Sequence, residues 1–512
     1  MNQEQNRPFS ANNVTKQNSS SISRRELLTI LGAGTAVMAL PGCKPSVSGS
    51  SSEFPLTDPL HYSTTTALAK AIRNRQVSSV DVVESCIKRI EDVNEDLNAV
   101  FQIQRESAIA RALDADAALT KGEIWGPLHG VPMTIKDSLD TAGVITTGGT
   151  KGRAAFIPDK DATVVARLIN AGAVLLGKTN TPEFTLSFET NNLIYGMTNN
   201  PYDLKRSPGG SSGGAAAMIA AGGTPFDIGS DYGGSIRLPS HFCGIAGIKP
   251  SSGRVPRTGH IYPFGGLQDS FQQLGPLARS VDDLPLLLEI IAGPDGIDPG
   301  VVPLPWYNWQ HVDLSKLKVS FHTDNGIISP TVETQHTVTS VAESLSKVVE
   351  EVTQVRPTGI DQTLDLFSLY LWDGGAAISR LAKKAGTTEF SITPPGRRKA
   401  INAKELDALI AQWYSFRSSM HSFMSDHDAI LCPVNSGPAR PHGPEMDDLT
   451  GFTYTITYNL TGWPGVVVRA GTSPEGLPIG VQIVTRPGRE DVALCLAKYV
   501  ELEFGGYQIP EL

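Results

Sequence analysis

The chain has 512 residues, which is long enough to bury a large hydrophobic core and, by length alone, to form roughly two to four domains. Hydrophobic residues make up 40% and charged residues 19% of the chain, as is ordinary for a soluble globular enzyme. The net charge of −9, without a run of basic residues, argues against nucleic acid as the main partner.

The N-terminus looks like an export signal. A polar stretch rich in Asn, Gln and Ser precedes Arg24 and Arg25, and an apolar segment follows over residues 27–40. That segment is short and contains glycine, so it does not predict a membrane span. Twin arginines ahead of a modest apolar segment resemble a twin-arginine signal, although Leu27 and Thr29 stand where Phe and Lys are common. We therefore expect export of the folded protein to the periplasm or cell envelope.

The end of the signal indicates a lipid anchor. Residues 40–43, with the sequence Leu-Pro-Gly-Cys, resemble a lipobox with an unusual Pro at the second position. We expect residues 1–43 to be the export signal, Cys43 to carry the lipid, and the Ser- and Gly-rich residues 44–58 to form a flexible tether to the membrane. The alternative is a signal that is cleaved without lipid attachment.

The other potential ligand residues do not predict a metal or redox centre. Cys86, Cys243, Cys432 and Cys495 lack CxxC spacing, and no His, Asp or Glu cluster has ligand spacing. We expect these cysteines to be buried free thiols, although export also permits a disulfide. We expect no metal and no cofactor.

The first elements after the tether are predicted to be scaffold. Apolar residues recur at helical spacing over residues 68–93, with a break at 76–78, and Ser78 looks like the N-cap of the second helix. Residues 100–103 are a candidate strand, and the alanine-rich residues 107–121 are a candidate helix.

Residues 131–136 alternate like a strand that delivers Lys136 at its end. A helix over 162–171 and a buried strand over 173–177 follow, and this alternation predicts a layered α/β core. A lysine alone is more often a surface ion-pair residue than a catalytic one. The apolar residues that lead into Lys136 are compatible with its burial.

Two clusters of Gly and Ser lie within residues 205–250. Ser211 belongs to the first and Ser235 to the second, 24 positions later, and the small apolar residues 215–223 between them predict a tightly packed helix. Glycine is costly inside helices and strands, so its density suggests that the backbone of this stretch lies very close to another group. Each cluster alone could be a flexible loop, but both are embedded in apolar, periodic sequence.

These motifs together resemble the amidase signature family, whose catalytic unit is Ser-cisSer-Lys. The 24-residue spacing of the serines matches, and so does the upstream Gly-Val-Pro-x-x-x-Lys-Asp pattern over residues 130–137. The resemblance implies that Ser235 is the nucleophile, that Ser211 bridges in a cis peptide, and that Lys136 is the base.

The resemblance also implies a fold, and it covers most of the chain. It is good over residues 60–295, recognisable over 452–500 and weak over 300–430. The fold it implies is a single large layered α/β/α domain over residues 59–512, with a central mixed β-sheet and a variable helical region at 300–430. Similar enzymes use that region to line the acyl or leaving-group pocket.

An oxyanion hole and its supports follow from the same resemblance. Backbone N–H groups would stabilise the tetrahedral oxyanion, namely those of Tyr232, Gly233, Gly234 and Ser235. The supporting side chains would be Ser212, Asp231 and Arg237. We interpret Asp231 and Arg237 as a structural pair that buttresses the loop.

The remaining elements continue the α/β pattern. We expect helices over 281–292 and 334–349, strands over 317–321, 429–433 and 465–468, a proline-rich border over 295–309, and largely helical structure over 361–425. The aromatic residues of the helical region are expected in the core rather than in a pocket, and they are Trp372, Phe390, Trp413, Tyr414 and Phe416.

The expected function is hydrolysis of a small-molecule amide through a serine acyl-enzyme. Ser235 would attack the carbonyl and pass its proton through Ser211 to a neutral Lys136. Deprotonating a lysine at pH 7 costs about 4.6 kcal/mol, which desolvation can largely remove. Neither the substrate amide nor the oligomeric state can be read from the sequence.

Three alternatives remain. Residues 210–214 satisfy the G-x-S-x-G pattern of a Ser-His-Asp α/β-hydrolase esterase, but the polar segment before them, which ends in proline, does not predict the strand that this motif needs. A non-catalytic binding lipoprotein would not need Lys136, Ser211 and Ser235 together. An amidotransferase subunit fits the family resemblance, but an export signal favours a stand-alone hydrolase.

Overall fold

The computed structural model describes most of the chain after the predicted tether, namely residues 56–57, 59–267, 269–393, 399–443 and 448–512. The predicted export signal, Cys43 and nearly all of the predicted tether lie outside the described residues. Of the helices that are described, none combines the length and the apolar character needed to cross a bilayer.

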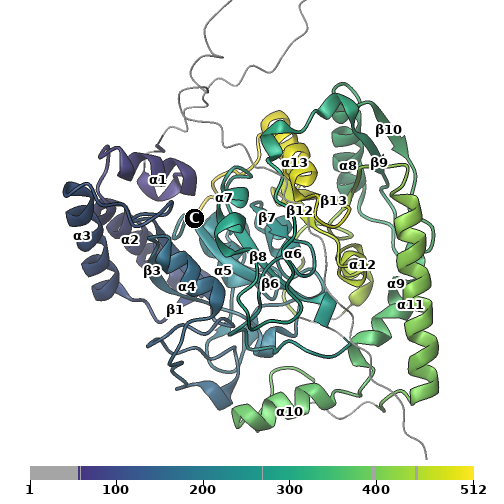
Figure 1. The fold of residues 1–512 in the computed structure, drawn as a ribbon, viewed down its shortest axis with the longest axis horizontal. Coiled ribbons are helices and arrows are strands. Elements are labelled where there is room, and N and C mark those ends of the chain that lie inside the picture. Colours follow the sequence, from purple (N-terminus) through teal and green to yellow (C-terminus); the bar gives the residue numbers. More distant parts are fainter. Residues whose placement is uncertain (1–55, 58, 268, 394–398, 444–447) are drawn as a thin grey trace, which may run out of the picture. The chain divides into compact units, whose positions relative to one another are not determined.

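Helices and strands alternate along the described chain (Figure 1). The helices are α1 (Thr65–Arg73), α2 (Ser79–Leu97), α3 (Arg105–Thr120), α4 (Thr163–Asn170), α5 (Gly213–Ala220), α6 (Arg237–Phe242), α7 (Asp283–Ile291), α8 (Val332–Leu345), α9 (Thr363–Leu366), α10 (Ala376–Ala385), α11 (Ala403–Phe423), α12 (Thr453–Thr461) and α13 (Glu490–Phe504). The strands are β1 (Val100–Phe101), β2 (Pro132–Lys136), β3 (Val174–Thr179), β4 (Asn191–Asn192), β5 (Gly196–Met197), β6 (Phe226–Asp231), β7 (Ala246–Lys249), β8 (Gln273–Ala278), β9 (Lys318–Phe321), β10 (Glu351–Gln354), β11 (Ala429–Pro433), β12 (Gly465–Thr472) and β13 (Pro478–Thr485).

A mixed sheet of eight strands lies at the centre of the fold, in the order β10-β9-β11-β13-β12-β7-β8-β6. Strand β9 runs parallel to both of its neighbours, β10 and β11, whereas all the other neighbouring strands are antiparallel. This confirms the predicted α/β class with a central mixed β-sheet.

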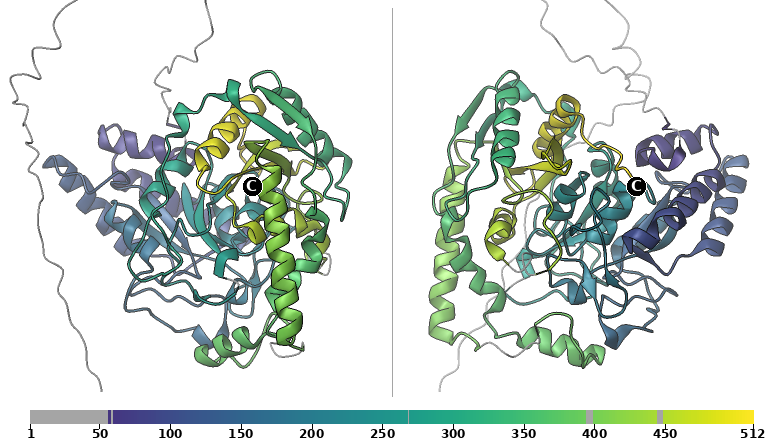
Figure 2. Two further views of the ribbon diagram at one scale, coloured as in Figure 1. Left: turned by 45° about the vertical axis from the view of Figure 1, so that its right-hand side comes forward. Right: turned by 180° about the vertical axis from the view of Figure 1, so that it is seen from behind.

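Helices cover both faces of this sheet, and β11 shows why. Successive side chains of a strand point to opposite faces. Ala429 and Leu431 belong to the hydrophobic cluster that includes residues of α7, α8 and α13, whereas Ile430 and Cys432 belong to the cluster that includes residues of α11 and α12. Figure 2 shows the helices and the sheet strands from two further sides. The arrangement is the expected α/β/α layering.

A smaller sheet carries the predicted lysine strand. Its order is β1-β3-β2, in which β2 and β3 are parallel and helix α4 makes the crossover between them. Lys136 is the last residue of β2, as the alternating sequence predicted. The whole strand is buried.

Local sequence signals placed several element boundaries correctly. Ser78 accepts a hydrogen bond from the N–H of Asp81, and the Asp81 side chain accepts one from the N–H of Ser78, so α2 starts with a capping box. Strands β6, β7, β8 and β13 were not predicted from the sequence. Every residue of these strands is buried, so most of their length lacks the alternation of polar and apolar residues by which a half-buried strand is recognised, and only short runs such as residues 226–228 of β6 alternate.

The expectation that the aromatic residues of the variable region belong to the core was correct only in part. Trp413 and Phe416 of α11 are buried, and the indole N–H of Trp413 donates to the carbonyl oxygen of Leu460 in α12 at 2.8 Å. Tyr414, by contrast, is 59% exposed, and Trp372 lines a cavity.

Candidate active site

Lys136 lies at the centre of a group of buried hydroxyl groups. Its side chain is fully buried, and Nζ lies 2.7 Å from Oγ of Ser211, 2.8 Å from Oγ of Ser212 and 3.0 Å from Oγ of Ser230. A neutral amine has two N–H groups and one lone pair, so three hydroxyl groups can satisfy it without a counter-ion. One of these hydroxyl groups then donates to the lone pair of Nζ.

Burial favours the neutral form of Lys136. Desolvation holds the pKa of Lys136 well below its usual value of 10.5, against the opposing effect of the negative charges on Asp227 and Asp231. Neither carboxylate forms an ion pair with Nζ in the described part of the chain. The site therefore favours the neutral amine of Lys136 more than solvent would.

The two predicted serines approach each other through the backbone. The peptide bond between Gly210 and Ser211 is cis, and the N–H of Ser212 donates to the carbonyl oxygen of Ser235 at 3.2 Å. Within the described residues, the hydroxyl groups of Ser211 and Ser235 do not share a hydrogen bond. Catalytic hydrogen bonds often form only when substrate binds, so this geometry is compatible with a relay.

The loop after β6 wraps around the carboxylate of Asp231. Oδ1 accepts a hydrogen bond from the N–H of Gly234 at 2.8 Å, and Oδ2 accepts one from the N–H of Ile236 at 3.2 Å. The N–H of Gly234 is therefore already engaged, although the sequence placed it in the oxyanion hole. Tyr232, Gly233 and Ser235 remain the candidate donors, and the N–H groups of Gly233 and Ser235 have no acceptor among the described residues.

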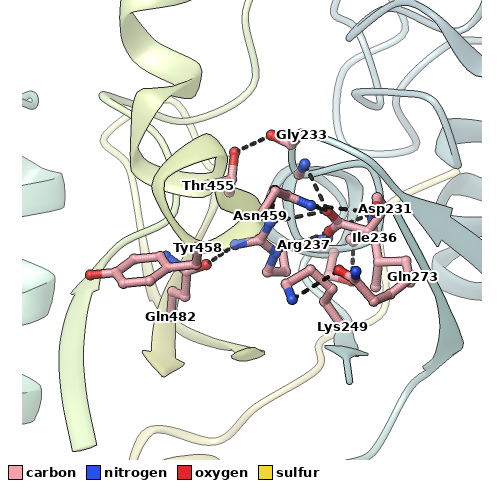
Figure 3. A network of polar contacts seen from close by, with 12 residues as sticks. Asp231, Gly233, Ile236, Arg237, Lys249, Gln273, Thr455, Tyr458, Asn459 and Gln482 are labelled. Carbon is pink, nitrogen blue, oxygen red and sulfur yellow. Dashed lines mark hydrogen bonds and ion pairs between the residues drawn. The ribbon is translucent and has the colours of Figure 1, made fainter. Parts of the chain in front are cut away.

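Asp231 and Arg237 form a buried bidentate ion pair (Figure 3). Arg237 donates from Nε to Oδ2 and from Nη2 to Oδ1, both at 3.0 Å, and both side chains are 0% exposed. Burial opposes ionisation of Asp231, but the charge of Arg237 and hydrogen bonds from Arg237 and Asn459 outweigh it and lower the pKa of Asp231. The pair fixes the loop that carries Ser235.

Side chains that are distant in the sequence complete this support. Arg237 also donates to Oε1 of Gln482 in β13 at 2.6 Å, and Nδ2 of Asn459 in α12 donates to Oδ1 of Asp231 at 2.8 Å. Neither Asn459 nor Gln482 was predicted as a site residue from the sequence. No local signal links them to Arg237, because only the fold brings α12 and β13 to the loop.

Asp227 is a third residue of the site that the sequence motifs did not indicate. It is fully buried in β6; Oδ1 accepts from the N–H of Lys136 at 2.9 Å, and Oδ2 accepts from the hydroxyl groups of Thr134 at 2.7 Å and Thr179 at 2.9 Å. Burial raises the pKa of Asp227 to about 6, although these hydrogen bonds oppose the shift. A carboxylate between the apolar residues Phe226 and Ile228 was the signal available in the sequence.

The histidines closest to the motifs in sequence have structural partners. Nε2 of His129 shares a hydrogen bond with the carbonyl oxygen of Ala115 at 3.0 Å. His241 shares one with the carbonyl oxygen of Gly437 at 3.0 Å, and its Nδ1 accepts from the N–H of Gly480 at 2.7 Å. Both rings therefore serve packing.

The serine cluster at 210–214 also lacks the context of an α/β-hydrolase. The preceding strand, β5, ends at Met197, so no strand leads directly into the cluster.

The potential ligand residues and cysteines do not form a metal or disulfide centre in the described ranges. No group of three or more His, Cys, Asp or Glu side chains in the described ranges is arranged to hold a metal ion. The four described cysteines are free; three of them are buried and Cys495 is partly buried. Burial raises the pKa of the thiol of Cys86 to about 12 and that of Cys432 to about 11.

Comparison with known proteins gives consistent matches over nearly the whole described chain. A family model described as Amidase matches residues 81–494. Fatty-acid amide hydrolase 2-B of Danio rerio is 35% identical over 492 residues, which cover 89% of this chain and 92% of that protein. A glutamyl-tRNA(Gln) amidotransferase subunit from Koribacter versatilis is 33% identical over 467 residues, which cover 84% of this chain and 96% of that protein.

Solved structures give the same result. A bacterial aryl acylamidase of the amidase signature family is 25% identical with a TM-score of 0.77, and the match covers 87% of this chain and 96% of that one. A 6-aminohexanoate cyclic dimer hydrolase is 27% identical with a TM-score of 0.75, and the match covers 87% of this chain and 97% of that one.

Proposed function

The chain belongs to the amidase family and is an amide hydrolase, and on this premise we propose that it acts through an acyl-enzyme on Ser235, with Lys136 as the base and Ser211 as the proton relay. The observation that carries the proposal is the 2.7 Å contact between Nζ of Lys136 and Oγ of Ser211 in a fully buried site. Burial keeps the pKa of Lys136 low, so the contact joins a hydroxyl group to a potential base.

Acylation begins with two linked proton transfers. Oγ of Ser235 forms a bond to the carbonyl carbon of the amide while its proton moves to Oγ of Ser211. The hydroxyl proton of Ser211 moves at the same time to Nζ of Lys136, which becomes an ammonium group. The C–N bond is still intact at this stage, and the negative charge lies on the former carbonyl oxygen.

The turn around Asp231 stabilises that charge. Candidate donors are the backbone N–H groups of Tyr232, Gly233 and Ser235, since Gly234 already donates to Asp231. The buried pair of Asp231 and Arg237 holds these groups in place before the substrate binds, so little reorganisation is needed.

Collapse of the tetrahedral intermediate reverses the relay. Lys136 returns its proton to Ser211, and Ser211 protonates the leaving nitrogen as the C–N bond breaks. Water then attacks the acyl-enzyme while Ser211 accepts its proton and passes its own to Lys136. The C–O bond to Ser235 breaks, the relay returns a proton to Oγ of Ser235, and the free acid leaves. Each cycle leaves the residues in their starting protonation states.

Export is a further part of the proposal. We infer from residues 24–25 and 40–43 that the enzyme is exported and anchored through Cys43. An exported enzyme would act as a stand-alone hydrolase and not as an amidotransferase subunit that needs partner chains.

Covalent labelling tests the catalytic assignment. A fluorophosphonate probe should form one adduct with the parental protein, and peptide mass spectrometry should place it on Ser235. Ser235→Ala should lose both the adduct and amide hydrolysis while remaining folded. An adduct on Ser211 or Ser212, or labelling that survives Ser235→Ala, would contradict the proposal.

A further inference from the structure

A cavity of about 580 Å³ lies between the loop over residues 260–267, the segment over 152–156 and helix α10 with the residues just before it. Large apolar side chains form much of its wall, and they are Phe156, Ile261, Phe264, Leu267, Trp372 and Leu381. The volume is in the range of pockets that hold small molecules.

The inner wall of this cavity approaches the candidate active site at two points. Tyr262 lines the cavity, and its ring centroid lies 5.5 Å from that of Tyr232, the residue that begins the oxyanion loop. His260 also lines the cavity; burial, followed by the positive charge of Lys136, lowers its pKa to about 3. The lining of the cavity thus contacts the residue that begins the oxyanion loop.

The cavity also has an excess of free positive charge. Its two carboxylates are already engaged: Asp140 pairs with Arg153 at 2.6 Å, and Asp373 accepts hydrogen bonds from backbone N–H groups at the start of α10. Arg380 and Lys384 are exposed residues of α10 that line the cavity, and neither has an acidic partner among the described residues. Their spacing of four residues places them on the same face of α10.

We propose that this cavity binds a part of the substrate that consists of an apolar chain or ring ending in a carboxylate, with Arg380 and Lys384 holding the carboxylate. The inference rests on the proposed function, because it assumes that the amide sits at Ser235. The aromatic and aliphatic wall buries the apolar portion, and the planar guanidinium of Arg380 can donate two parallel hydrogen bonds to the two carboxylate oxygens.

Matched substrates and variants test this inference. The acyl arm compares the mono-p-nitroanilide of adipic acid, which keeps a free carboxylate, with the neutral p-nitroanilide of hexanoic acid. The amine arm compares N-hexanoyl-4-aminobenzoate with N-hexanoylaniline. Each pair is measured with the parent, with Arg380→Gln/Lys384→Gln, and with Lys383→Gln, which removes an exposed charge from the same helix outside the cavity lining.

The readout is the ratio of kcat/KM for the anionic substrate to that for its neutral partner. In one arm the parent should favour the anionic substrate, and the double variant should lower this ratio by about tenfold, mainly through KM, whereas Lys383→Gln should keep it. The arm that responds identifies the side of the amide that enters the cavity. Equal ratios for the parent and the double variant in both arms would overturn the inference.

The proposed function is judged separately. If the parent hydrolyses the neutral substrates and Ser235→Ala does not, the proposed function stands even when the charge preference is absent. If Ser235→Ala hydrolyses these substrates like the parent, the proposed function fails, and the inference about the cavity fails with it.

Discussion

The backbone N–H of Lys136 donates a 2.9 Å hydrogen bond to Oδ1 of Asp227. Asp227 thereby joins β6 to the strand that carries the candidate base, and its hydrogen bonds to Thr134 and Thr179 extend the connection to β2 and β3. Its charge also raises the pKa of Lys136, against the larger effect of desolvation. One carboxylate thus positions the lysine and influences its protonation.

Asp227→Asn should therefore move the rising limb of the pH profile of kcat/KM to lower pH. The base acts when Lys136 is deprotonated, so activity rises with pH through the pKa of Lys136. The pKa of Asp227 is about 6, so Asp227 is charged at neutral pH and opposes deprotonation of Lys136. Removing this charge lowers the pKa of Lys136, and we expect a shift on the order of one pH unit.

Asp283→Asn is the matched control for this prediction. Asp283 is also buried with its pKa raised to about 6, but its carboxylate accepts from the N–H groups of Thr65 and Thr66 at the start of α1. This control should leave the limb in place. A limb that does not move in Asp227→Asn, or that moves to higher pH, would show that Asp227 does not influence the base.

Lys136→Ala should lose most of kcat, whereas His129→Ala and His241→Ala should keep substantial turnover. Removal of a general base typically costs about 10²–10⁴-fold. Both histidines bond to backbone groups, so their loss affects packing. Steady-state kinetics on folded variants decide the point, and a histidine variant that is folded but inactive would refute the assignment of Lys136.

The relay also predicts non-additivity. Ser211→Ala combined with Lys136→Ala should lose far less activity than the product of the two single losses, because the residues act as one unit. If the losses of the two single variants multiply fully in the double variant, Ser211 and Lys136 act independently and the relay is contradicted.

Gly234→Ala should destabilise the protein and abolish activity. Gly234 has a φ of +131°, and a Cβ there would lie 2.7 Å from Cβ of Thr455. Thr455 is itself held by a hydrogen bond from its hydroxyl to the carbonyl oxygen of Gly233 at 2.7 Å. The collision would disturb the oxyanion loop, at an expected cost of about 1–3 kcal/mol in the free energy of unfolding.

Gly293→Ala separates backbone strain from this collision. Gly293 has a φ of +93°, and a Cβ there would meet nothing within 4 Å. We expect it to be less destabilised in urea denaturation and to keep its activity. Equal stability and activity of the two variants would mean that the contact with Thr455 does not matter.

Cys43→Ala should move the enzyme from the membrane fraction to the soluble fraction of the cell envelope. Lipoprotein processing attaches more than one acyl chain, which is enough for stable anchoring. Fractionation followed by an activity assay gives the distribution, and replacing Arg24 and Arg25 with Lys tests the export route separately. A Cys43→Ala protein that stays membrane-bound like the parent would rule out the lipid anchor.

The sequence predicted the parts of the molecule that depend on local chemistry. The spacing of Ser211 and Ser235, the approach to Lys136 and the capping residue Ser78 are properties of short segments, and the structure contains each of the corresponding local elements. The family and the fold class followed from these motifs.

The tertiary structure alone determined which side chains surround the motifs. Asp227, Ser230, Asn459 and Gln482 contact Lys136 or the Asp231–Arg237 pair from strands and helices that are up to 245 residues away from their partners in the sequence. It also determined that the N–H of Gly234 is engaged by Asp231. Sequence patterns report which residues are apolar or flexible, but the desolvation and hydrogen bonding that set a pKa depend on neighbours that only folding brings together.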